Sequence, residues 1–151
     1  SYLGLGTSAA SMLTAPEYDM LAEQNTSLPA RSQDTARVRL VVLDSPRKIA
    51  EGTSLFSTEF DVELLTHREA LAEDLMLHAR LMEPISPALL AESEQIFGAS
   101  HLQDVLDACV RDGLLDRVDL TDSRIETSYR PTEKGWLLGN ELYGRLWDLR
   151  L

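Results

Sequence analysis

The apolar residues of this chain change their spacing twice in its second half, and this constrains the fold more than any other feature. They recur at helical spacing from about residue 66 to 113, alternate with polar residues from 118 to 129, and return to helical spacing from 132. Predicted helix starts are the capping box Thr66-His67-Arg68-Glu69, the pair Ser86-Pro87 and the residues after Ser100; predicted ends are Pro84, Gly98 and Gly113. Three consecutive helices are therefore expected to pack together.

A β-hairpin and one further helix are expected after these three. Val118 and Leu120, and then Ile125, Thr127 and Tyr129, alternate with polar residues on either side of the turn signal Thr121-Asp122-Ser123-Arg124. The predicted final helix is capped by Thr132 and carries a stripe of Leu138, Leu142, Leu146 and Leu149, with Trp136 and Trp147 beside it as core or contact residues. This order of elements predicts an α+β fold, a mostly helical winged-helix-like domain with a small β-hairpin.

The first 57 residues give weaker signals. A strand-like run, Tyr2-Leu3-Gly4-Leu5-Gly6, opens the chain, which is how a fragment of a longer protein begins. A short helix is predicted over residues 16–23, a polar linker or mobile loop over 25–34, a strand over 38–43, and a short helix from Pro46 to about Gly52. We therefore expect a strand, loop and linker segment over residues 1–57 and the helical domain over residues 58–151.

The net charge and its distribution along the chain restrict the classes of binding partner that we expect. The net charge is −11, and residues 51–110 alone carry twelve acids against two bases. Such a surface repels phosphate groups, so neither nucleic acid nor an anionic membrane is expected as a partner, and the third predicted helix has three acids against one base. No apolar run reaches the roughly 18 residues of a membrane span, and no signal peptide is visible, so a cytoplasmic protein is expected.

Residues that bear metal or nucleophile chemistry are sparse. The single cysteine, Cys109, falls within a predicted buried stripe and is expected to be an inert core thiol. His67, His78 and His101 match no metal-ligand spacing, and His78 is expected to be a hydrogen-bonding residue at the edge of the core. The acidic run Glu59-Phe60-Asp61-Val62-Glu63 is interpreted as a solvated, partly strand-like edge.

The glycines near the start allow two interpretations. Gly4-Leu5-Gly6-Thr7-Ser8-Ala9 fits a loose phosphate-loop pattern, which needs a full strand before it and a helix after it. The simpler alternative is a turn at a strand end, where small residues let the backbone bend or approach a ligand.

Three stretches together resemble the oxygen-independent coproporphyrinogen III oxidases, a radical-SAM family. Leu3-Gly4-Leu5-Gly6-Thr7-Ser8-Ala9-Ala10-Ser11-Met12 is similar to the loop that closes their catalytic barrel. Arg111-Asp112-Gly113-Leu114-Leu115 and Thr132-Glu133-Lys134-Gly135-Trp136-Leu137-Leu138-Gly139-Asn140 are similar to the end of their C-terminal domain. Glu73, Arg80 and Phe97-Gly98 also fit the family's helices, whereas residues 14–57 diverge.

The resemblance implies the C-terminal lid or docking domain of such an enzyme, preceded by the remnant of the last barrel strand. In the family, a four-iron four-sulfur cluster on a C-x-x-x-C-x-x-C run cleaves S-adenosylmethionine, and propionates of a porphyrinogen are oxidatively decarboxylated to vinyl groups in haem biosynthesis. The cysteine run would belong to an N-terminal barrel in cis, so this polypeptide alone is expected to be inert.

The same resemblance places Gly6, Ser8, Ala9 and Ala10 at the border of the S-adenosylmethionine pocket. It assigns no catalytic residue and no metal ligand to this chain. Ala10 stands where some members have a branched aliphatic residue, and Thr7-Ser8-Ala9-Ala10 lacks the proline and histidine of other members. Two alternatives therefore stay open: a haem-binding chaperone paralogue of the family, and a stand-alone winged-helix protein-interaction module.

Overall fold

The computed structural model describes residues 1–4, 6–52, 54, 57–119 and 127–151. The fold is mixed α+β, and the chain divides into two compact units, Ser1–His67 and Arg68–Leu151, which are described separately. No helix in the described ranges is long and apolar enough to cross a membrane.

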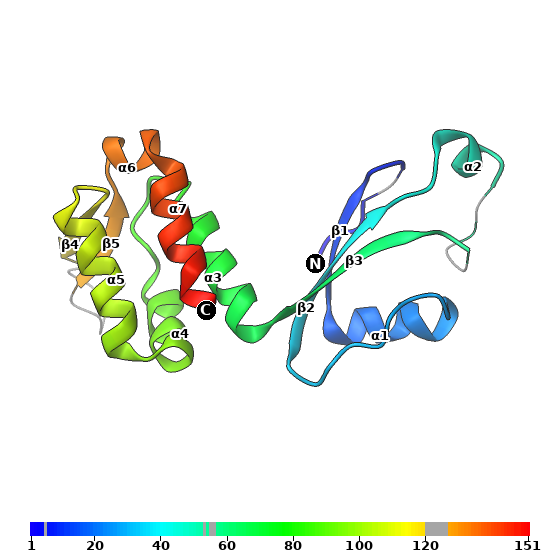
Figure 1. Ribbon diagram of the computed structural model, residues 1–151, viewed down its shortest axis with the longest axis horizontal. Helices are drawn as coiled ribbons and strands as arrows, with labels where there is room; N and C mark the ends of the chain where they lie inside the picture. The colour runs from blue at the N-terminus through cyan, green and yellow to red at the C-terminus, as the bar shows by residue number, and fades with distance from the viewer. Residues whose placement is uncertain (5, 53, 55–56, 120–126) are drawn as a thin grey trace. The chain divides into compact units, whose positions relative to one another are not determined.

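The first unit is a three-stranded antiparallel sheet with one helix against it (Figure 1). Its strands β1 (Ala10–Thr14), β2 (Thr35–Val42) and β3 (Phe60–Thr66) lie in the order β1-β2-β3. Helix α1 (Ala15–Gln24) begins with a capping box between Thr14 and Glu17, and its Tyr18 packs against Val38 and Leu40 of β2. A small core therefore lies between α1 and one face of the sheet.

The short elements of this unit largely follow their local signals. The predicted helix over 16–23 is α1, the predicted strand over 38–43 is β2, and Pro46 begins α2 (Pro46–Ala50), in which the Ser45 hydroxyl accepts a hydrogen bond from Lys48 N. Residues 25–34 form a loop, as predicted, but this loop joins two elements of the same unit.

The predicted strand over residues 2–6 is wrong for the described positions. Tyr2 makes only an isolated bridge to Met12, and the sheet strand begins at Ala10. Gly6 has a φ of 107°, which turns the chain where an extended run was expected.

The second unit is mostly helical. It contains α3 (His67–His78), α4 (Pro87–Phe97), α5 (Ala99–Arg111), the antiparallel pair β4 (Leu115–Asp119) and β5 (Thr127–Pro131), and then α6 (Glu133–Leu137), α7 (Gly139–Trp147) and a final 3-10 turn, Asp148–Arg150. The predicted starts and ends of α4 and α5 are confirmed closely, and α3 begins at the predicted place but ends at His78, before Pro84. The predicted turn Thr121-Asp122-Ser123-Arg124 lies outside the described residues.

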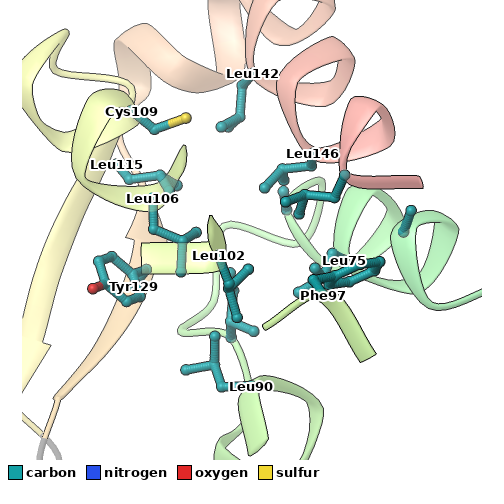
Figure 2. Packing of buried hydrophobic residues seen from close by; sticks show 14 of the residues in the cluster. Leu75, Leu90, Phe97, Leu102, Leu106, Cys109, Leu115, Tyr129, Leu142 and Leu146 are labelled. Atoms are coloured by element: carbon teal, nitrogen blue, oxygen red, sulfur yellow. The ribbon is translucent and has the colours of Figure 1, made fainter. Parts of the chain in front are cut away.

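One core joins these elements (Figure 2). Its buried residues come from α3, α4, α5, the hairpin and α7, and include Leu75, Leu90, Phe97, Leu102, Leu106, Cys109, Leu115, Tyr129, Leu142 and Leu146. Burying each large aliphatic side chain contributes about 1.5–3 kcal/mol relative to leaving it exposed, so this core is the main source of stability in the second unit.

The single helix predicted from Thr132 is two helices in the structure. Leu138 has φ −95° and ψ 37°, which breaks the helix between α6 and α7. Leu138 is consequently 49% exposed, whereas Leu142, Leu146 and Leu149 of the same predicted stripe are buried as expected. Trp136 is also exposed, while Trp147 packs against the core.

The boundary between the units lies later than the predicted 57/58. Strand β3 pairs with β2 over seven register positions, so residues 60–66 belong to the first unit. Strand pairing of this kind joins segments distant in sequence, and the period-2 signal of β3 alone does not reveal its partner.

Candidate functional site

The turn before β1 holds the four residues that the resemblance assigns to a cofactor pocket. Ser8 has a φ of 58°, and its amide donates to Val42 O at 3.0 Å; Ala9 N donates to Gly6 O at 3.2 Å, and Val42 N donates to Ala9 O at 3.1 Å. Gly6, Ser8 and Ala10 are exposed, and Ala9 is half-buried. The structure thus places Gly6, Ser8 and Ala9 in one tight turn at the end of the β1–β2 ladder, and Ala10 begins β1 directly after it.

This turn excludes one interpretation and leaves another open. The phosphate-loop pattern needs a helix after the glycines, but β1 follows them, so that interpretation is wrong. The amides of Ser8 and Ala9 are already bonded within the turn, and a ligand would meet small exposed side chains instead. An amide nest for phosphate therefore does not fit this turn.

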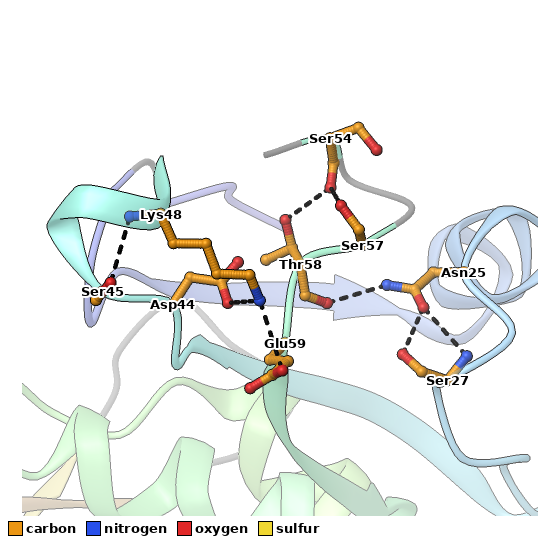
Figure 3. A network of polar contacts seen from close by, with 9 residues as sticks. All are labelled: Asn25, Ser27, Asp44, Ser45, Lys48, Ser54, Ser57, Thr58 and Glu59. Atoms are coloured by element: carbon orange, nitrogen blue, oxygen red, sulfur yellow. Dashed lines mark hydrogen bonds and ion pairs between the residues drawn. The ribbon is translucent and has the colours of Figure 1, made fainter. Parts of the chain in front are cut away.

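A polar network occupies the same end of the sheet, where β2 ends and β3 begins (Figure 3). Lys48 Nζ lies 2.7 Å from Asp44 Oδ1 and 3.5 Å from Glu59 Oε1. The hydrogen bond that Lys48 Nζ donates to the Asp44 carboxylate raises the pKa of Lys48. Asp44 Oδ2 has no hydrogen-bond partner, but the side chain is only 1% exposed and already covered by the first unit itself. Its carboxylate is therefore a structural group that no docking ligand can reach from outside.

The other half of this network anchors the 25–34 loop. Asn25, which is buried, donates from Nδ2 to Thr58 O at 3.2 Å, and its Oδ1 accepts from Ser27 N at 3.1 Å and Ser27 Oγ at 2.6 Å. Thr58 Oγ1 donates to Ser54 O at 2.9 Å (Figure 3). These contacts hold the end of α1 against the start of β3.

In the second unit, the two C-terminal motifs quoted above come into direct contact. Thr132 Oγ1 donates to Gly113 O at 2.7 Å and accepts from Gly135 N at 2.9 Å, and Thr132 N donates to Leu114 O at 3.1 Å. Gly135 lies so close to the same carbonyl that a Cβ there would be 2.0 Å from Leu114 O. The junction therefore requires a hydroxyl at Thr132 and glycine at Gly135, and Gly113 beside it has a φ of 69°, which favours glycine.

Charged groups reinforce the junction from outside. Lys134 Nζ donates to Asp112 O at 2.6 Å, and Arg145 forms ion pairs with Asp112 at 2.6 Å and Glu141 at 2.9 Å. Both carboxylates raise the pKa of the Arg145 guanidinium. Cys109 is fully buried nearby, and burial raises the pKa of its thiol, as an inert core cysteine requires.

The exposed side of α5 carries both acidic and basic side chains. Arg117 of β4, a basic residue of the predicted wing, is paired with Asp107 of α5 at 2.6 Å, and Gln103 Nε2 donates to the same carboxylate at 2.7 Å. Asp104 adds a further negative charge beside a hollow lined by Arg111 and Arg117. Asp104 is therefore an exposed acid of this helix, whereas the charge of Asp107 is paired with Arg117.

The three histidines do not converge. His67 begins α3, His78 ends it, and His101 lies in α5; the Nδ1 of His78 is buried without a hydrogen-bond partner. Within the described ranges, no three His, Cys, Asp or Glu side chains are grouped as metal ligands. With one cysteine in the whole sequence, the chain's own residues do not fit a cluster that needs three.

Comparisons with known proteins give no further identification. No family model, no curated protein and no solved structure matches the chain.

Proposed function

We propose that this chain is the C-terminal, mostly helical lid or docking part of a coproporphyrinogen-oxidase-like radical-SAM protein that acts in porphyrin and haem biosynthesis. The whole protein would oxidatively decarboxylate propionates of a porphyrinogen to vinyl groups in the cytoplasm. The second unit is then a winged-helix-like domain, and residues 1–13 follow from the last strand of an N-terminal barrel in cis.

One observation carries this proposal. The resemblance lies in separate stretches of sequence. Two of them, Arg111-Asp112-Gly113-Leu114-Leu115 and the stretch from Thr132 to Asn140, form a single junction through Thr132 and Gly135. Residues that must satisfy one junction are restricted together, which is the pattern expected of a shared structural motif and not of chance similarity.

In this proposal the N-terminal barrel carries out the reaction, and this chain contributes little of the chemistry. A cluster and S-adenosylmethionine, held by the barrel, would supply the oxidising chemistry. The turn at Gly6, Ser8, Ala9 and Ala10 would border the S-adenosylmethionine pocket with small, exposed side chains. The second unit would cover the barrel mouth and exclude water from the substrate cavity.

The first test is the coding sequence upstream of Ser1. A C-x-x-x-C-x-x-C run is expected there, and its absence would refute the radical-SAM proposal.

The second test uses the full-length protein with its cluster reconstituted under anaerobic conditions. Release of 5′-deoxyadenosine from S-adenosylmethionine together with decarboxylation of coproporphyrinogen is expected. Cleavage of S-adenosylmethionine with coproporphyrinogen untouched would keep the class and reject the substrate, and stable haem binding without decarboxylation would favour the haem-carrying paralogue.

A second candidate function is a winged-helix protein-interaction module. Its support is the separate core of the second unit, which is enclosed by α3, α4, α5, the hairpin and α7. A natural gene that starts near Ser1 would favour this candidate over the lid.

A further inference from the structure

An open hollow of about 480 Å³ lies at the corner between α6 and α7. It is lined by Trp136, Leu137, Leu138, Gly139, Asn140, Glu141 and Tyr143. Trp136, Leu137 and Leu138 are 53%, 67% and 49% exposed, which is unusual for three consecutive large apolar residues. The volume falls within the range of small-molecule sites in proteins.

The helix break at Leu138 and the glycine after it create this hollow. A Cβ at Gly139 would lie 2.5 Å from Cε2 of Tyr143, so only glycine lets the Tyr143 ring lie against the start of α7. The ring and the exposed Trp136 indole thus both border the hollow. Sequence periodicity assigned Leu138 to a buried stripe and could not reveal this surface.

A positive charge without an acidic partner stands beside the hollow. The guanidinium of Arg80, in the turn after α3, lies 5.1 Å from the centroid of the Tyr143 ring. No described carboxylate is ion-paired with Arg80, although Arg31, Arg39, Arg47, Arg117 and Arg145 all have acidic partners. Arg80 is itself exposed, and Leu77 and Leu81, which are close to it in sequence, are exposed as well.

The acidic residue of the hollow does not supply the missing counter-ion. Glu141 is bound to Arg145, with its Oε1 accepting from Arg145 Nε at 3.0 Å and lying 2.9 Å from the second guanidinium nitrogen. Asn140 is neutral and exposed. The charged group without a described carboxylate partner is therefore the Arg80 guanidinium, which lies over the ring of Tyr143, a lining residue of the hollow.

We propose that this corner is a binding site for a small organic anion with a flat apolar body. The body would lie on Trp136, Leu138 and Tyr143, and its carboxylate or sulfonate would pair with the Arg80 guanidinium, whose planar fork suits such groups. The site uses residues of the second unit only, so it does not depend on the proposed barrel or its chemistry.

The test is titration of the 151-residue protein with anilinonaphthalene sulfonate, an anionic planar dye, and with Nile red, an uncharged one. Because the hollow is open, binding in the micromolar to millimolar range is expected. Arg80→Gln should weaken binding of the sulfonate dye by about fivefold and leave Nile red within about twofold, because one exposed charge-assisted contact is lost. Trp136→Ser should weaken both dyes.

Arg111→Gln is the matched control, because Arg111 is an exposed arginine of the same unit that borders a different hollow. Circular dichroism would verify that each variant is folded. Unchanged affinity for the sulfonate dye in Arg80→Gln, or an equal loss in Arg111→Gln, would overturn the proposal. A loss of dye binding as protein concentration rises would also overturn it, since a second copy would then occupy the corner.

Discussion

Replacement of Gly135 by alanine should destabilise the second unit strongly. The new Cβ would lie 2.0 Å from Leu114 O, 2.9 Å from Leu114 C and 3.1 Å from Leu114 Cα. These are backbone atoms, and Leu114 O also accepts hydrogen bonds from Thr132 N and Thr132 Oγ1, so the carbonyl cannot move away without loss.

The expected magnitude combines three effects. Overpacking costs about 1–3 kcal/mol, and the loss of the Thr132 N hydrogen bond to Leu114 O costs about 1 kcal/mol. The higher helix propensity of alanine offsets up to about 1 kcal/mol of this loss in the free energy of unfolding. The net loss in the free energy of unfolding should therefore be about 1–3 kcal/mol, or roughly 5–20 °C in melting temperature for a unit of this size.

Tryptophan fluorescence during urea unfolding measures this loss selectively. Both tryptophans, Trp136 and Trp147, lie in the second unit, so their emission reports that unit and not the sheet of the first. Gly144→Ala is the matched control: it lies in α7, a Cβ there would meet nothing within 4 Å, and it should stabilise by about 0.5–1 kcal/mol. If Gly135→Ala lost less than about 0.5 kcal/mol, the close approach at Leu114 would be wrong.

Three further predictions concern other sites. Cys109 should resist iodoacetamide in the folded protein and react when the protein unfolds in urea, because the thiol is buried and burial raises its pKa. Mass spectrometry would follow the labelling. Rapid labelling of the native state would contradict the buried position of Cys109. Asp107→Asn should lower the melting temperature at pH 7 more than at pH 3. The hydrogen bond that Arg117 donates lowers the pKa of the Asp107 carboxyl in the folded protein. The ion pair therefore stabilises the fold above the ordinary carboxyl pKa, and this contribution is lost as the pH falls through the pKa of Asp107 in the folded state. Asn25→Ala should remove the contact to Thr58 O and destabilise the first unit by about 1–3 kcal/mol, seen as faster hydrogen exchange in β3; unchanged exchange would refute the anchoring role.

The parts of the fold that sequence predicted well are those with local causes. Ser86 caps α4 by accepting from Leu89 N at 3.2 Å, and Gly98, with φ 88°, ends it, so both signals are read within a few residues. The same holds for Pro46, which begins α2, and for Thr132, whose hydroxyl caps α6. Hydrogen bonds of this kind join residues that are close in sequence, so a single sequence is enough to predict them.

The parts that sequence missed depend on distant partners. The pairing of β3 with β2 moved the unit boundary, and the break at Leu138 turned one helix into two. At the corner of Trp136 and Tyr143, the contact of Arg80 with the Tyr143 ring joins the turn after α3 to α7, more than sixty positions further along the chain. Of the two interpretations of the glycines near the start, the turn at a strand end agrees with Gly6, Ser8 and Ala9, and the role of these residues and Ala10 at a cofactor stays a prediction.

The direct succession of β3 and α3 limits where the chain can be cut into separately folding fragments, and it bears on folding during synthesis. Strand β3 ends at Thr66 and α3 begins at His67, so strand and helix are contiguous. A fragment that starts at residue 58 would keep Phe60, Val62 and Leu64 without α1 and β2, which these side chains pack against in the first unit. A strand without its partners exposes unpaired backbone groups, which can pair with the same strand of another molecule. During synthesis β2 leaves the ribosome before β3, so the sheet can protect this segment as soon as it appears.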